Sequence, residues 1–234
     1  GARLEYSTYL GGRFDTVQAI AVDAERSAYA AGSVWSDDLP LSADALRSKR
    51  EFQDGFLLRL SPDGSSVWYS TLVGGASSEQ VRGVAVAASG MVYLCGSTYS
   101  WDLQTTEGAW QAAPGGLADG FVMAIDLSGP RVAGLTYAGG QQADSAIAVR
   151  VDTAGFVVVE GETSSEDLIA PENAVQPKYG GGASDGFLAI LGPELQPVSF
   201  TYVGGSGEDR AGALALDGTG DAWVGLNTLS ADLE

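Results

Sequence analysis

One short pattern returns four times along this chain. It is written YSTYLGG at residues 6–12, YSTLVGG at 69–75, LTYAGG at 135–140 and FTYVGG at 200–205. The glycine pairs therefore begin at positions 11, 74, 139 and 204, a spacing of 63, 65 and 65 residues. Self-similarity at a fixed period limits a chain to folds built from repeated units, so the repeat is considered before any other feature.

Further landmarks keep the same period. An Asp-Gly-Phe triplet starts at Asp54, Asp119 and Asp185. An alternating apolar run occurs as AIAVD (19–23), GVAVA (83–87), AIAVR (146–150) and ALALD (213–217). A Ser-x-Asp-Leu motif follows at Ser36, Ser100, Ser165 and Ser230. Landmarks that share one period show that the whole chain is organised by this repeat.

Each repeat holds four short apolar runs, and these indicate β-strands. In the second unit, VRGVAVA and MVYLCGS are separated by a short turn, and GFVMAID and RVAGLTYAGG follow after a long loop. Runs of this length bounded by Gly, Pro, Asp and Ser are typical of strands joined by hairpins. We therefore predict an all-β fold, a β-propeller of four-stranded antiparallel blades with a period of about 64 residues, and a partial or small propeller.

The combined pattern YSTYLGG…AIAVD…AYAAGS…SxDLP…DGFLLRLSPDGS…YST resembles the SBBP repeats, known as seven-bladed β-propeller repeats of bacterial proteins. The resemblance covers essentially the whole chain. It implies a propeller in a secreted or surface protein, hence a bacterial, extracytoplasmic location, and it implies no shared catalytic residues. The third unit departs from its siblings at Arg150, Glu160 and Glu162, which indicates that it is specialised.

We expect a single domain over 1–234 with five parts. These are an outer strand of a preceding or closing blade (1–12), three blades (13–75, 76–140, 141–205) and the start of a further blade (206–234). Two hypotheses follow. In one, the chain is a segment of a longer propeller. In the other, it is a compact four-bladed ring, closed when the strand at 3–10 completes the last blade.

Composition excludes several classes of function. Histidine is absent, which removes the commonest general base and metal ligand. Twelve basic residues are scattered among thirty acidic ones, with a net charge of −18, so nucleic acid is not an expected partner. No apolar run reaches the length of a membrane span, and no signal peptide is visible at the start. The single cysteine, Cys95, allows no internal disulfide.

The long loops at 35–54, 98–119 and 163–185 are the predicted contact surface, because loops carry function more often than the strands that support them. Exposed tryptophans are frequent interaction hot spots, although packing of these loops against the blades is an equally good interpretation. A second set of candidates is the repeated aspartate of Ser-x-Asp-Leu, for which a structural role in shaping the loop is the alternative. The partner-binding candidates are Trp35, Trp101, Trp110, Asp38, Asp102 and Asp167.

The other acidic positions have structural interpretations. The acids that follow each glycine pair (Asp15, Glu79, Asp144 and Asp209) are expected to cap turns, and the glycines themselves to let the backbone turn. The DGTGD segment at 217–221 carries oxygen ligands that calcium accepts, but a hairpin explains it better. We predict no cofactor and no catalytic residue, with calcium as the alternative.

The preferred hypothesis is a non-enzymatic module that binds another protein or a surface polymer, or has a structural role. A second hypothesis is an accessory subunit of a larger complex. A third is a carboxylate-dependent glycan hydrolase using Glu160 and Glu162, because paired carboxylates can cleave glycosidic bonds without histidine.

Overall fold

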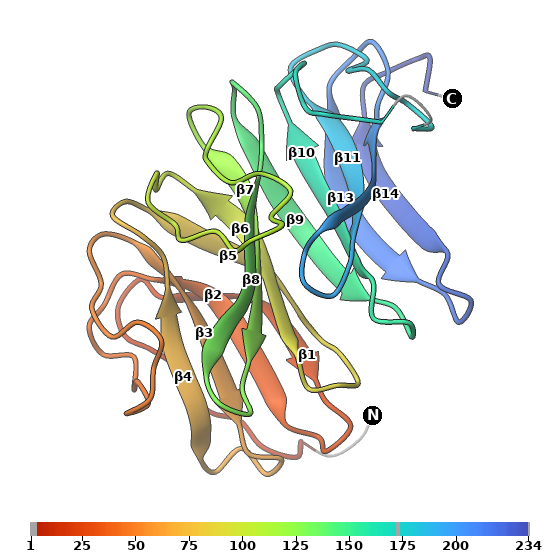
Figure 1. Ribbon diagram of the computed structural model, residues 1–234. Helices are drawn as coiled ribbons and strands as arrows, with labels where there is room; N and C mark the ends of the chain where they lie inside the picture. Colours follow the sequence, from red (N-terminus) through yellow and green to blue (C-terminus); the bar gives the residue numbers. More distant parts are fainter. Residues whose placement is uncertain (1–3, 172–173, 234) are drawn as a thin grey trace.

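The computed structural model describes residues 4–171 and 174–233, which form fourteen strands in four antiparallel sheets. Figure 1 shows the sheets following one another in chain order, from the first near the N-terminus to the last beside the C-terminus. Within these ranges there is no helix of the length and apolar character needed to cross a membrane.

Three sheets have four strands and the last has two. The first contains β1 (Thr16–Val22), β2 (Ala28–Val34), β3 (Asp54–Leu60) and β4 (Val67–Val73). The second contains β5 (Glu79–Val86), β6 (Val92–Thr98), β7 (Asp119–Asp126) and β8 (Arg131–Ala138). The third contains β9 (Asp144–Val151), β10 (Val157–Thr163), β11 (Asp185–Leu191) and β12 (Pro197–Val203). The last pairs β13 (Asp209–Leu216) with β14 (Ala222–Thr228).

The prediction of a β-propeller is wrong. The all-β class and the repeated four-stranded units are observed, but the four sheets hold four, four, four and two strands, and among the described residues no ring is closed. Closure would require the N-terminal segment to pair with β14, and within the described ranges β14 pairs with β13 alone. The compact four-bladed ring is therefore not formed.

The N-terminal segment packs against its own unit. Residues 4–10 form no strand, although their sequence matches that of β4, β8 and β12. The ring of Tyr6 lies so close to Gly64, in the turn between β3 and β4, that a side chain at Gly64 would overlap it. Tyr6 and Leu10 also pack on the buried cluster of the first sheet. Part of the expected strand, residues 1–3, lies outside the described residues.

The hydrophobic core lies between neighbouring sheets as well as within them. One buried cluster joins β2, β3 and β4 to the second sheet, and another joins the second sheet to the third. The first strands β1, β5, β9 and β13 pack on one another in series. Each unit therefore depends on its neighbours for burial, as expected for a repeat protein.

The long loops cover the outer edge of each fourth strand. The N–H groups of Leu72, Tyr137 and Tyr202 donate to loop carbonyls at Arg47, Gln111 and Gln176, at 3.1, 3.1 and 3.0 Å. An uncovered edge strand presents unpaired N–H and C=O groups, so this contact protects the edge.

Candidate functional site

A repeated polar joint connects each unit to the next. The acid at the start of the following unit accepts the N–H of the second glycine of the pair, at 3.0 Å for Glu79, 2.6 Å for Asp144 and 2.7 Å for Asp209. The serine of Ser-x-Asp-Leu donates its hydroxyl to Asp144 (2.9 Å, Ser165) and to Asp209 (2.7 Å, Ser230). These bonds tie three of the repeated motifs into one structure.

The glycine pairs have a different role from the one expected. The first glycine of each complete joint does not have a positive φ; it allows two carboxylates to approach the backbone. A Cβ added at Gly139 would lie 2.0 Å from Oδ1 of Asp119 and 2.9 Å from Oδ2 of Asp144. Gly74 and Gly204 have the same surroundings. Any side chain there would displace a buried acid.

The repeated aspartates of Ser-x-Asp-Leu contact the same joint. Oδ1 of Asp102 accepts the N–H of Ala76 (2.8 Å), and Oδ1 of Asp167 accepts that of Gln141 (3.1 Å). In the last unit, Asp232 accepts the N–H of Ser206 (2.9 Å). Asp38 is exposed, and its own N–H donates to the Ser36 hydroxyl. A role in partner binding stays a prediction for Asp38, Asp102 and Asp167.

The aspartates of Asp-Gly-Phe are buried, and their negative charge is stabilised in one of two ways. Burial raises the pKa of Asp119 and of Asp185 to about 6, while the N–H groups of nearby loop glycines oppose the shift. At the equivalent position, Asp54 forms an ion pair with Arg47 (Nε–Oδ2 3.1 Å). Burial still raises the pKa of Asp54, and the Arg47 guanidinium opposes it. In the first unit, Arg47 thus stabilises the buried carboxylate of Asp54, as glycine N–H groups do for Asp119 and Asp185.

The three candidate tryptophans lie in different environments. The side chains of Trp35 and Trp101 are 51% and 74% exposed. Trp110 is half-buried, and its ring packs on Phe200 of the third sheet with a centroid separation of 5.3 Å. Trp110 therefore stabilises the contact between units, whereas Trp35 and Trp101 present apolar surface to solvent. The structure does not gather the three into one cluster.

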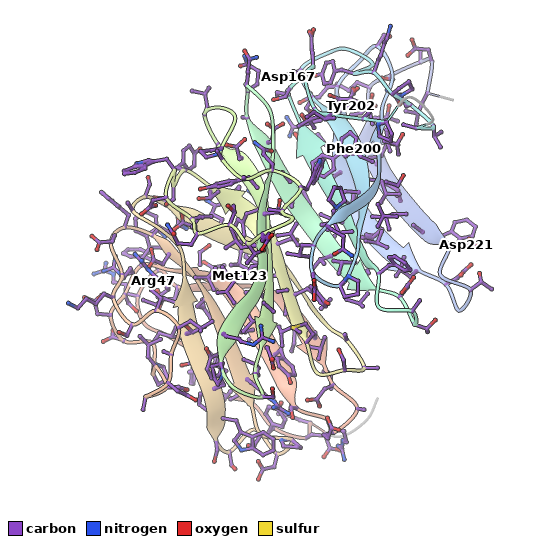
Figure 2. The ribbon with its side chains drawn as sticks, viewed as in Figure 1. Arg47, Met123, Asp167, Phe200, Tyr202 and Asp221 are labelled. Carbon is purple, nitrogen blue, oxygen red and sulfur yellow. The ribbon has the colours of Figure 1, made fainter. Side chains whose placement is uncertain are left out.

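A groove lies where the first unit meets the second, which we call the first junction. It encloses about 360 Å³. Its apolar walls include Leu46, Leu103, Met123 and Leu135, and Arg47 and Asp102 supply its charged groups. Figure 2 labels Arg47 on the first unit and Met123 on the neighbouring sheet. Of the six partner-binding candidates, only Asp102 lines this first-junction groove, beside the glycine pair at 74–75.

The second junction, between the second and third units, has larger residues at the matching positions. The N–H groups of Arg47 and Gln111 both donate to the threonine of a fourth strand, Thr71 and Thr136, so Leu46 and Trp110 occupy equivalent positions one residue earlier. Leu135 and Phe200 are likewise equivalent, each one residue before that threonine. The groove was not predicted from the sequence, and its signal there is this difference in side-chain size between units.

The remaining candidates show no assembled site. Glu160 is fully buried in β10, and burial raises the pKa of its carboxyl, while Glu162 lies two residues further along the same strand. Cys95 is buried, and burial raises the pKa of its thiol to about 12. Asp217 accepts the N–H groups of Thr219 and Asp221, as in a hairpin turn. Across the described residues, no group of three or more Cys, Asp or Glu side chains is placed to hold a metal ion. The absence of a cofactor, with calcium as the alternative, stays a prediction.

Comparison with known proteins gives little further information. No protein-family model matches the chain, and no curated protein matches it. Among solved structures, the chain is similar to an acylaminoacyl peptidase in complex with Z-Gly-Gly-Phe-chloromethyl ketone, with 8% sequence identity and a TM-score of 0.39. The match covers 83% of this chain and 26% of the peptidase chain. A likeness at this level supports no inference about fold or activity.

Proposed function

We propose that this chain is a non-enzymatic interaction module that binds another protein through its long loops. The observation that carries the proposal is that each long loop presents exposed, large apolar side chains. They are Trp35, Leu46, Phe52, Tyr99, Trp101, Leu117, Ile169 and Val175. Large exposed apolar surface on a folded chain is typical of a surface that contacts a partner. The loops leave the carboxyl ends of the second strands, so successive units present them in series.

Trp101 is the proposed central anchor. Its indole is the most exposed of the three loop tryptophans, and the next residue, Asp102, is held by the N–H of Ala76. A fixed backbone beside a large apolar side chain lowers the entropy lost on binding. Tryptophan is also enriched among residues whose truncation costs the most binding energy.

The proposal includes an extracytoplasmic location in a bacterium and membership in the SBBP repeat family, on the strength of the sequence resemblance alone. The net charge of −18 supports a partner with a basic surface, because charge complementarity steers association and suppresses wrong partners. A structural subunit of a larger complex would use the same loops.

Capture experiments with matched variants test the proposal. The immobilised chain is exposed to envelope and extracellular proteins of the source organism, and retained proteins are quantified. Trp101→Ala should remove specific partners, whereas Trp68→Ala should retain them, because Trp68 is 53% exposed on β4, outside the long loops. Equal capture by the two variants would overturn the proposal for these loops. Capture of a polysaccharide and of no protein would mean that the partner is a surface polymer, which would overturn the proposal of a protein partner.

A further inference from the structure

We propose that the first-junction groove binds an aromatic side chain presented by a partner protein, in the place that Trp110 fills at the second junction. The inference rests on the proposed function, since the partner supplies the ring. It adds a defined site and a defined ligand chemistry to it. The exposed loop residues alone indicate neither the groove as the site nor an aromatic side chain as the ligand.

The two junctions have equivalent residue positions on their two walls. At the second junction, the ring of Trp110 from one unit packs on Phe200 of the next, and Phe200 in turn packs on Tyr202 at 5.3 Å and on Phe187 at 5.6 Å. At the first junction the same two positions hold Leu46 and Leu135. With a smaller side chain on each wall, the space that an indole fills at one junction is open at the other.

The walls of the first-junction groove are apolar. Leu103, Met123 and Leu135 are buried and form an apolar surface, and Leu46 is 36% exposed at the rim. A methionine thioether makes favourable contacts with aromatic rings. The cavity of about 360 Å³ lies at the lower end of the size of small-molecule sites, which run from roughly 300 to 1,000 Å³. A single anchoring side chain is the occupant that this size and lining favour.

The guanidinium of Arg47 is a fixed cation at this groove. Arg47 donates through Nε to Asp54 (3.1 Å) and through Nη2 to the carbonyl of Gly75 (2.7 Å), so its guanidinium is held at the groove before any ligand arrives. A guanidinium near an aromatic face gains a cation–π attraction that an aliphatic side chain does not offer. The second junction has Gln111 at this position, where an internal tryptophan already occupies the space. Arg47 therefore favours an aromatic ligand over an aliphatic one.

The partner that carries the aromatic ring is expected to have basic residues beside it. Asp102 lines the groove and directly follows the exposed Trp101, so the groove adjoins the loop proposed to contact a partner. The chain carries a net charge of −18. An aromatic residue flanked by basic residues on a partner protein fits both the apolar groove and the net negative charge of the chain.

The chain's two methionines provide the test. Met123 lines the groove, whereas Met91 lies in the turn between β5 and β6, so ¹³C-methyl labelling of methionine gives one reporter and one internal control. The probes are the peptides acetyl-Lys-Trp-Lys-amide and acetyl-Lys-Leu-Lys-amide. We expect the tryptophan peptide to shift the Met123 signal and leave Met91 unchanged, with at least tenfold weaker binding of the leucine peptide.

Two variants fill the groove from within. Leu46→Trp and Leu135→Phe each copy a residue of the second junction, and each should reduce binding of the tryptophan peptide at least tenfold while the Met91 signal keeps its folded position. Having two variants protects the test if one of them fails to fold. No shift of Met123, equal shifts of both methionines, or full binding by both variants would overturn the groove proposal. Because this assay needs no partner, it can fail while the capture experiment succeeds, and the reverse is equally distinguishable.

Discussion

The first and second junctions share one backbone arrangement and differ in the side chains between the units. At each, a loop residue bonds to the threonine of a fourth strand, and an acid of the next unit accepts the N–H of the second glycine of the pair. The second junction is closed by Trp110 and Phe200, whereas the first has Leu46 and Leu135 in their place and a groove between them. The polar joint therefore builds the array, and the apolar positions decide which junction is open.

This difference separates scaffold from site. Residues that repeat in every unit, such as the joint acids, satisfy backbone groups that burial would otherwise leave unpaired. Residues that break the repeat are free of that requirement. Three of them, Leu46, Leu135 and Arg47, line the first-junction groove. The asymmetry is hence more informative about function than the motifs that recur.

The largest expected effect is on the packing of the closed junction. Trp110→Ala removes a half-buried ring that contacts Phe200 and should lower the free energy of unfolding by about 3 kcal/mol. Leu46→Ala removes a side chain that is 36% exposed and should cost about 1 kcal/mol or less. Urea unfolding followed by circular dichroism measures both variants. Equal losses would mean that the two junctions are packed alike.

The next effect concerns the buried acid of the first unit. Arg47→Ala leaves Asp54, which is fully buried, without its ion-pair partner, and we expect a loss of about 2 kcal/mol in the free energy of unfolding. Gln111→Ala removes the side-chain acceptor of the Gly139 N–H and the side-chain donor to the Ala113 carbonyl, and it should cost about 1 kcal/mol. The same unfolding assay compares the two. A smaller loss at Arg47 than at Gln111 would show that the arginine does not stabilise its joint.

The smallest expected effect is a dependence on pH. Burial raises the pKa of Asp119 and Asp185 to about 6, above the ordinary value of 3.8, so the folded chain binds these protons more tightly than the unfolded chain. The free energy of unfolding should therefore rise as the pH falls from 7 to 5, by roughly 1 kcal/mol for each group.

Matched amide variants assign that pH dependence. Asp119→Asn should reduce the rise between pH 7 and 5 by about half, because Asp185 still titrates. Asp54→Asn should flatten it less, since Arg47 opposes the upward shift of the Asp54 pKa. A wild-type profile that falls on acidification over this range would contradict the assignment.

Local features of the fold were predictable from the sequence, and long-range ones were not. Each four-stranded unit was predictable because the turns and apolar runs that define a strand, such as β5 and its neighbour β6, lie within a few residues of each other. The closed ring, one of the two hypotheses, is not observed among the described residues, because residues 4–10 pack on the first sheet and do not pair with β14. The local pattern of a strand is the same in either case.

The candidate site was predictable only in part. The exposure of Trp101 and the packing of Trp110 depend on what each loop meets in the next unit, and their sequence surroundings do not distinguish them. The groove depends on Leu46 and Leu135, which lie in different units and share no motif. Its signal is a difference in side-chain volume at positions that become equivalent only once the loop is aligned through the threonine contacts.

One exchange tests most directly the claim that these side chains alone decide which junction is open. The variant Trp110→Leu/Phe200→Leu gives the second junction the residues of the first, and binding of acetyl-Lys-Trp-Lys-amide is measured by calorimetry in the background of Leu46→Trp, which closes the first junction. We predict that the peptide, which the Leu46→Trp parent does not bind, binds again with a stoichiometry of one. A folded triple variant that fails to bind the peptide would contradict the account.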